Sequence, residues 1–310
     1  MSWIDSTRTD LEVPFGTGTH RTAVWIYPPR AASTGRPLLL VHGFRGDHHG
    51  MDLIGHHSRR HPVIVPDLPG FGATPPLPGG LGLSSYVEFV AGLLAVLTEQ
   101  WEEQPLLVGH SFGSILTAHL AAQCSADSAD LDIDALVLIN PITAPALEGP
   151  SRLATGLARL YYAISARLPE RAGNAVLGHP LIVRVMSEVM ATTRDPGLRR
   201  YIHDQHDRYF SSYSDRESLA EAFDVSVGHT VTEVAEQLTM PVLVIAGDSD
   251  AIAPRAATQR FIDLLSCARA EWFSGVGHLV HYERPEETAQ LIAQFAQQLR
   301  HQEGERAGVR

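Results

Sequence analysis

Short runs of consecutive apolar residues recur along the chain, separated by segments in which apolar positions repeat with a helical period. Uninterrupted apolar runs flanked by Gly, Pro, Asn or Asp are typical of strands buried on both faces of a parallel sheet. These runs occupy residues 38–41, 63–65, 106–108, 135–139 and 242–246. Helical periodicity covers residues 86–97, 113–122 and 285–299. The alternation predicts an α/β fold with a doubly wound, mostly parallel sheet.

The alternation stops after Asn140-Pro141, where a long stretch carries helical periodicity without a convincing strand. This stretch is far longer than an ordinary connection between two elements. We therefore expect an inserted helical lid over residues 142–237, and an α/β core formed by residues 1–141 and 238–301. The polar residues 302–310 show no periodicity and are expected to fray.

One helical face in the first part of this insertion is apolar, and Tyr161 and Tyr162 lie beside it in the sequence. Such a face normally packs against the body of a protein. We therefore expect it to hold the insertion on the core rather than to contact a substrate. The face consists of Leu153, Leu157, Leu160, Ile164 and Leu168.

The composition, with 44% apolar and 19% charged residues among 310, is that of an ordinary globular protein. A formal net charge of -11 without a basic cluster argues against nucleic acid as a partner. Cys124 and Cys267 are too few for a disulfide framework and suit a reducing compartment. Without a signal-like start or a membrane-spanning stretch, we expect a cytoplasmic protein. The oligomeric state stays open.

The motif G-x-S-x-G occupies residues 109–113, directly after an apolar run and directly before helix-forming residues. Strand, tight turn and helix are the context in which this motif presents a nucleophilic serine. Small residues are needed on both sides, because side chains at Gly109 and Gly113 would collide with neighbouring backbone. Ser111 is therefore the candidate nucleophile.

A serine hydroxyl is a weak nucleophile at neutral pH, so an imidazole must take its proton and a carboxylate must orient that imidazole. Asp248 and Asp250 lie in the loop after the last apolar run, at the sheet edge where open α/β folds bind ligands. His278 and His281 follow a final predicted strand at residues 271–273. The residues favour Asp250 and His278 but leave both alternatives open.

A second glycine-rich turn, His42-Gly43-Phe44-Arg45-Gly46, follows the first apolar run. Glycines let backbone N–H groups approach a ligand closely, and such groups can stabilise an oxyanion. We expect one donor from Phe44 and the other from Phe112, the residue after the candidate nucleophile. His42 is expected to hold this loop by hydrogen bonds rather than to act as a base.

Sixteen histidines raise the question of a metal site. The groups to consider are His48 with His49, His56 with His57, and His203 with Asp207 on one predicted helical face. No H-E-x-x-H motif or comparable ligand set occurs in the sequence. We expect neither a catalytic metal nor another cofactor.

Taken together, five segments resemble the α/β-hydrolase superfamily over residues 37–299, apart from the insertion, whose sequence varies widely in that family. The segments are His42-Gly43-Phe44, Asp67-Leu68-Pro69-Gly70-Phe71-Gly72, and residues 109–113, 247–254 and 277–285. The family pattern G-x-x-D-x-x-x-P implies that Asp250 is the acid. The pattern G-H-x-x-x-x-E implies that His278 is the base. The resemblance thus favours Asp250 over Asp248 and His278 over His281.

Haloalkane dehalogenases and epoxide hydrolases of this superfamily carry aspartate at the elbow, so the serine argues against those activities. Lid-bearing esterases, carbon–carbon bond hydrolases, perhydrolases and aminopeptidases share the serine. The leading interpretation is a serine hydrolase that cleaves a small or medium, largely apolar carboxylic ester through an acyl-enzyme.

Two alternatives remain. A carbon–carbon bond hydrolase acts on a ring-cleavage product, whose carboxylate Arg45 could bind; a solvated loop cation is the simpler interpretation of Arg45. From a different class, a non-catalytic ligand receptor would not need the complete set of Ser111, Asp250 and His278.

Overall fold

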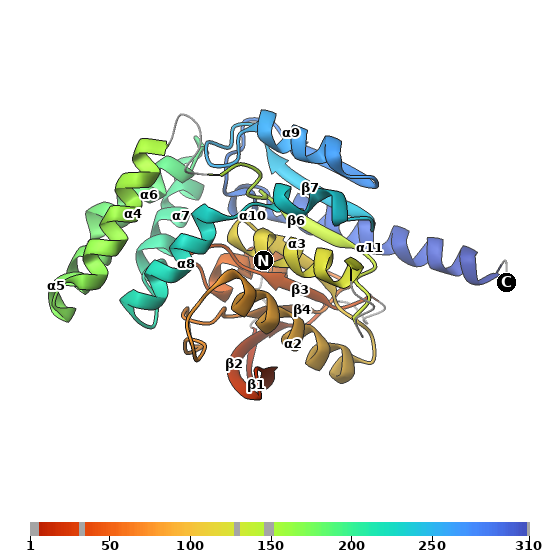
Figure 1. Ribbon diagram of the computed structural model, residues 1–310. Coiled ribbons are helices and arrows are strands. Elements are labelled where there is room, and N and C mark those ends of the chain that lie inside the picture. The colour runs from red at the N-terminus through yellow and green to blue at the C-terminus, as the bar shows by residue number, and fades with distance from the viewer. Residues whose placement is uncertain (1–5, 31–34, 127–130, 146–151, 309–310) are drawn as a thin grey trace.

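The computed structural model describes residues 6–30, 35–126, 131–145 and 152–308, and an eight-stranded sheet forms its centre (Figure 1). The strands are β1 (Thr7–Phe15), β2 (Gly18–Tyr27), β3 (Leu38–Val41), β4 (Val63–Pro66), β5 (Leu106–His110), β6 (Leu136–Ile139), β7 (Val242–Gly247) and β8 (Ala268–Phe273). Their order is β1-β2-β4-β3-β5-β6-β7-β8, and the pairs from β4 to β8 are parallel. The predicted mostly parallel sheet is confirmed.

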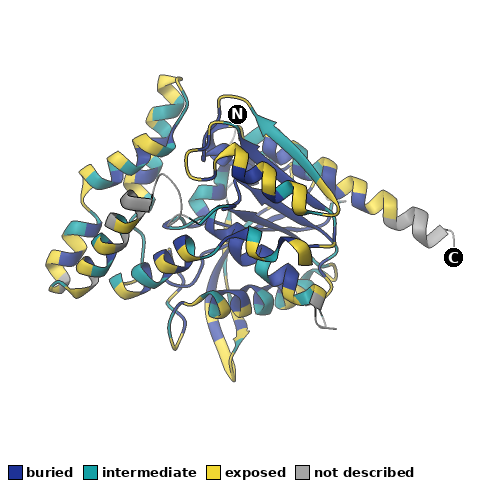
Figure 2. Ribbon diagram, turned by 45° about the horizontal axis from the view of Figure 1, so that its top comes forward, coloured by how far each residue is buried: buried dark blue, intermediate teal, exposed yellow. Residues whose placement is uncertain are grey.

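Helices cover both faces of this sheet. One face carries α2 (Leu83–Trp101), α3 (Phe112–Ala126) and α9 (Arg255–Leu264), and the other carries α1 (Asp52–His57) and α11 (Pro285–Gly308). Successive strand residues enter the two cores alternately, with Leu39 in the first and Leu38 and Leu40 in the second. The central strands are therefore buried throughout, as Figure 2 shows. This double burial explains the uninterrupted apolar runs.

The first two strands form an antiparallel hairpin that the apolar runs did not predict. β1 pairs with β2 through a tight turn at Gly16, and β2 pairs antiparallel with β4. Most residues of β1 are exposed or half-buried, because this strand lies at the sheet edge. Its apolar residues therefore alternate with polar ones, and no continuous run marks it.

Within the described residues, five α-helices lie between β6 and β7 and gather on one side of the core, drawn in green to teal in Figure 1. They are α4 (Arg152–Arg167), α5 (Glu170–Leu177), α6 (Pro180–Met190), α7 (Pro196–Tyr209) and α8 (Arg216–Gly228). The following 3-10 helix η2 (Val231–Gln237) packs against α3 and α9 of the core. The helices of the insertion thus end at Gly228, earlier than the predicted boundary at Gln237.

The prediction for the apolar face of α4 is wrong where the structure describes it. Leu160 and Ile164 are 55% and 49% exposed, and Leu168 is half-buried. Tyr162 is buried instead, on the side of α4 that contacts α8. The side chains of Leu153 and Leu157 lie outside the described residues. Packing between helices of the insertion, rather than against the sheet, decides which face is buried.

The C-terminal helix α11 continues to Gly308 and thus includes residues 302–308, which were expected to fray. Val309 and Arg310 lie outside the described residues. Within residues 6–308, as far as they are described, no helix combines the length and apolar character needed to cross a membrane.

Candidate active site

Ser111 is the single residue between β5 and α3. Its φ of +53° lies in the left-handed region, which residues with a side chain rarely adopt. A Cβ on Gly109 would lie 2.3 Å from Oγ1 of Thr117. A Cβ on Gly113 would lie 2.1 Å from the carbonyl oxygen of Val41. Both positions therefore require glycine, as the motif predicted.

The Ser111 hydroxyl lies 2.8 Å from Nε2 of His278, and Nδ1 of that imidazole lies 2.8 Å from Oδ2 of Asp250. The three residues follow β5, β8 and β7, whose carboxyl ends meet at one sheet edge because these strands are parallel. A neutral imidazole carries one donor and one acceptor nitrogen. A proton on Nδ1 bound to the carboxylate leaves Nε2 free to accept the serine proton.

The carboxylate of Asp250 is buried and held at both oxygens. Oδ1 accepts hydrogen bonds from the amides of Ile252 and Ala253 at 2.8 and 3.0 Å. Burial alone would raise the pKa of this carboxyl, but the charge of His278 and the hydrogen bonds hold its pKa below the ordinary value. Asp250 is therefore ionised near neutral pH and favours the Nδ1–H form of His278.

Asn140 is a site residue that the sequence interpretation did not include. It follows β6 directly, with a left-handed φ of +44°. Its side-chain amide donates to Oδ2 of Asp250 at 2.9 Å and to the carbonyl of Gly277 at 3.2 Å. Asn140 thus joins the loop of the acid to the loop of the imidazole. A polar residue at the end of a buried strand, at the edge that carries Ser111, is the signal that could have identified it.

Asp248, the alternative acid, accepts hydrogen bonds from the amide of Gly275 at 2.8 Å and from the hydroxyl of Ser249 at 2.9 Å. These bonds tie two loops together at the surface.

His281, the alternative base, lies in α10 (Val280–Glu283), and its ring centroid is 4.1 Å from that of His110. Burial lowers the pKa of His281 well below its ordinary value.

Phe44 and Phe112 line the same cavity as Ser111. Phe112 is the first residue of α3, so its N–H has no acceptor inside the helix. Phe44 belongs to a turn closed by a hydrogen bond from the Gly46 amide to the Gly43 carbonyl at 3.1 Å. Counting partners among the described residues alone, neither of the two amides donates a hydrogen bond. Both are therefore available to a ligand oxygen.

His42 holds the same loop through hydrogen bonds of both its ring nitrogens. Its Nδ1 lies 2.8 Å from the Gly43 carbonyl, and its Nε2 accepts a hydrogen bond from the Leu68 amide at 2.9 Å. Burial lowers the pKa of His42, so the ring is neutral. The predicted loop-holding role is confirmed.

A cavity of about 230 Å³ lies beside Ser111, between the core and the insertion. Its apolar lining includes Phe44, Met186, Met190, Phe223, Val227 and Leu279. The charged residues in the lining, Arg45 and Asp47, are buried and bound to other protein groups. The prediction of a solvated cation is therefore wrong for Arg45, which is 1% exposed.

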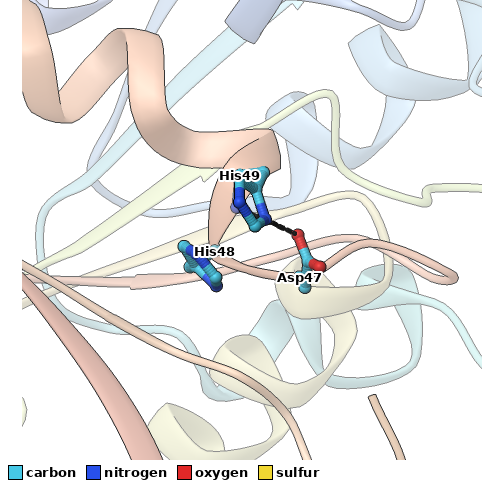
Figure 3. Close-up of side chains that lie close together, drawn as sticks. All are labelled: Asp47, His48 and His49. Carbon is cyan, nitrogen blue, oxygen red and sulfur yellow. Dashed lines mark hydrogen bonds and ion pairs between the residues drawn. The ribbon is translucent and has the colours of Figure 1, made fainter. Parts of the chain in front are cut away.

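Figure 3 shows Asp47, His48 and His49, whose possible ligand atoms lie within 4.8 Å of one another. Nδ1 of His49 bonds to Asp47 at 2.9 Å, and Nδ1 of His48 bonds to Asp67 at 2.8 Å. The two imidazoles are tilted by 37° to one another, with centroids 3.9 Å apart. These bonds and contacts account for the cluster without an ion, and two imidazoles with one carboxylate fall short of a four-ligand structural site.

Of the two other pairs considered from the sequence, neither belongs to a cluster of three possible ligands within the described residues. Nδ1 of His203 lies 2.6 Å from the Ser187 hydroxyl, whereas Asp207 pairs with Arg184 at 2.5 Å.

Known proteins of similar sequence include a biotin biosynthesis protein and a lipase. The chain is 25% identical over 266 residues to the biotin biosynthesis bifunctional protein BioHC of Cellvibrio japonicus. The aligned region covers 85% of this chain and 48% of that protein. It is 33% identical over 113 residues to the lipase LipV of Mycobacterium tuberculosis, covering 36% of this chain and 39% of that protein. The chain thus spans less than half the length of these two relatives.

Among solved structures, a thermophilic esterase from Thermogutta terrifontis superposes with a TM-score of 0.73 at 23% identity, covering 94% of this chain and 99% of the esterase. At that identity the likeness concerns the fold. Residues 38–291 match the sequence model of the alpha/beta hydrolase family. The chain belongs to the alpha/beta hydrolase family.

Proposed function

We propose that this chain is a serine hydrolase that cleaves a small or medium carboxylic ester. The observation that carries the proposal is the hydrogen-bonded series from Ser111 through His278 to Asp250, with both contacts at 2.8 Å. An imidazole so placed can take the serine proton as the hydroxyl attacks a carbonyl carbon.

In the proposed reaction, Nε2 of His278 accepts the proton of Ser111 while Oγ bonds to the acyl carbon. The amides of Phe44 and Phe112 stabilise the resulting oxyanion. The protonated imidazole then gives its proton to the departing alcohol, leaving an acyl-enzyme. Water, activated by the same imidazole, releases the carboxylic acid and restores the serine.

The lining of the cavity supports an ester with a neutral, apolar acyl group. A ring-cleavage product carries a carboxylate, which requires a cation in the pocket. Arg45 is committed to acceptors within the protein, and no other arginine lines the cavity within the described part of the chain. The lack of a free arginine in the described cavity lining favours an ester over the substrate of a carbon–carbon bond hydrolase. The esterase and lipase among the similar proteins point in the same direction.

Covalent labelling tests the proposal. A fluorophosphonate should modify Ser111 alone, because reaction requires a serine activated by a base. Ser111→Ala should remove the labelling and lower p-nitrophenyl butyrate hydrolysis by at least about 10³-fold, since it removes the nucleophile. Ser125→Ala on the exposed end of α3 is the matched control and should retain both the labelling and the ester hydrolysis.

A parent protein that neither reacts with the fluorophosphonate nor hydrolyses esters would point to a non-catalytic receptor. Activity of Ser111→Ala within about tenfold of the parent would move the nucleophile elsewhere.

A further inference from the structure

Arg45 occupies a turn position that suits glycine better. The turn of residues 43–46 is closed by the Gly46 amide on the Gly43 carbonyl, and Arg45 is its third residue, with φ of +60°. A positive φ at the third position of a turn favours glycine, because a Cβ is strained there. An arginine at this position indicates that its side chain makes contacts that offset the strain.

The Arg45 side chain leaves the core and ends inside the insertion. Nε donates to the carbonyl of Phe210 at 2.9 Å, and Nη2 donates to the carbonyl of Leu177 at 3.1 Å. Nη1 donates to the hydroxyl of Tyr162 at 3.1 Å. These acceptors belong to α4, the end of α5 and the end of α7. One side chain therefore connects three helices of the insertion to the turn.

No carboxylate of the described residues pairs with this buried guanidinium; its further contacts include the Ser211 hydroxyl at 3.3 Å and two aromatic rings. The guanidinium carbon lies 5.0 Å from the ring centroid of Phe210 and 5.9 Å from that of Tyr213. A displaced N–H group would be left buried without an acceptor, which is costly. The guanidinium is thus confined to one position.

The residue before Arg45 is Phe44, the proposed oxyanion donor. Its ring lies between the core and the insertion, 6.0 Å from that of Phe71 and 5.9 Å from that of Tyr162. Tyr162 therefore contacts both Phe44 and Arg45.

We infer that Arg45 is a positioning residue, which fixes the Phe44 N–H relative to Ser111 by tying the turn to the insertion. This inference rests on the proposed function, because the N–H matters only if an oxyanion forms. A carbonyl carries its full negative charge only in the transition state and intermediate. Loss of Arg45 should therefore lower kcat more than it raises KM.

The test compares Arg45→Met with Arg216→Met. Arg216 also ties helices of the insertion together, through Nη1 to the carbonyls of Ser165 and Leu168 at 2.5 and 2.6 Å, but it does not contact the turn. Arg45→Met should lower kcat for p-nitrophenyl butyrate by at least about tenfold, with KM within about threefold. Arg216→Met should keep kcat within about threefold. An unchanged kcat in Arg45→Met, or an equal loss in Arg216→Met, would overturn the inference.

Tyr162→Phe keeps the ring against Phe44 and removes one acceptor of Arg45, so it tests the same contact if Arg45→Met does not fold. It should lower kcat more than Arg216→Met does, at unchanged KM; an unchanged kcat or a change in KM alone would contradict the positioning role.

Hydrogen exchange distinguishes failure of this inference from failure of the proposed function. The peptide of residues 42–47 should exchange faster in Arg45→Met than in the parent, and Arg216→Met should leave it unchanged. An inactive parent with this exchange pattern would refute the ester hydrolase but support the tie between turn and insertion. An active parent with identical exchange in all three proteins would refute the tie.

Discussion

Ser111 is held in its left-handed conformation by groups around it. Its amide donates to the carbonyl of Ile139 at 3.1 Å, and its carbonyl accepts from the Ser114 amide at 2.9 Å and the Ser114 hydroxyl at 2.5 Å. A left-handed residue with a side chain costs about 1–2 kcal/mol. The bonds from β6 and α3 offset that cost and leave the hydroxyl directed at His278.

Asp250→Asn should lower kcat by about 10³–10⁴-fold, because an amide favours the wrong tautomer of the His278 imidazole. Asp248→Asn is the matched control. Its carboxylate binds Gly275 and Ser249 at the surface, so activity should stay within about threefold of the parent. Ester hydrolysis by the two purified variants, after circular dichroism has verified their folding, provides the measurement. The opposite ranking would assign the acid to Asp248.

At the scale of elements, the turn between β5 and α3 is packed against the end of β3. The Cβ of Gly113→Ala would lie 2.1 Å from the carbonyl oxygen of Val41 in β3, and β3 cannot move away without breaking its pairing with β5. We expect this variant to be destabilised by about 3 kcal/mol or more. Gly156→Ala in α4 meets no atom within 4 Å and should be neutral or stabilising by up to about 1 kcal/mol. Urea unfolding of both variants tests the difference; equal stability would contradict the steric argument.

Helix α6 brings Met186 and Met190 to the cavity, while Leu181, Val185 and Val189 on its other side are exposed. If the acyl group lies against this helix, Met190→Ala should enlarge its pocket. Each methylene that the substrate buries contributes about 0.8 kcal/mol. We therefore expect the preferred acyl chain to lengthen by about one or two methylenes.

Relative kcat/KM values over p-nitrophenyl esters from acetate to decanoate give the measurement. Met240→Ala removes a buried methionine outside the cavity and should keep the parent's ranking. An unchanged ranking in Met190→Ala would place the acyl group away from α6.

At the scale of the whole molecule, several neutral histidines are buried where the core meets the insertion. Burial lowers the pKa of His110 to about 3 and that of His206 to about 4. The unfolded chain takes up protons at these residues near their ordinary pKa of about 6.5, whereas the folded protein does not. Their contribution to stability is therefore complete above about pH 6.5 and is lost as the pH falls toward the folded values.

His206→Gln should reduce the pH dependence of stability between about pH 6 and pH 4.5, because one differential proton contributes about 1.4 kcal/mol per pH unit. Urea unfolding at several pH values checks this slope. His301→Gln, at an exposed position of α11, should leave the slope unchanged. A parent whose stability rises as the pH falls through this window would contradict the neutral state of the buried histidines.

The parts of the fold predicted from the sequence are those with a local cause. The apolar runs marked β3 to β7 because each strand residue is buried on one face or the other. The glycines at 109 and 113 marked the turn because any Cβ there collides with nearby backbone. The edge strand β1 was missed because its apolar residues alternate with polar ones. Its neighbour β2 was missed although residues 23–27 form an apolar run.

The sequence by itself determined the parallel core, the turn at Ser111 and, through the family patterns, the pair Asp250 and His278 that the structure brings together. Only the tertiary structure decided how Asn140 joins their loops, which face of α4 is buried and where Arg45 ends. Strand burial and tight turns depend on neighbours in the chain and leave a periodic signature. The bond from Arg45 to the Phe210 carbonyl joins residues 165 positions apart. This bond exists because the insertion docks on the turn, and such docking produces no periodic pattern of apolar residues in the sequence.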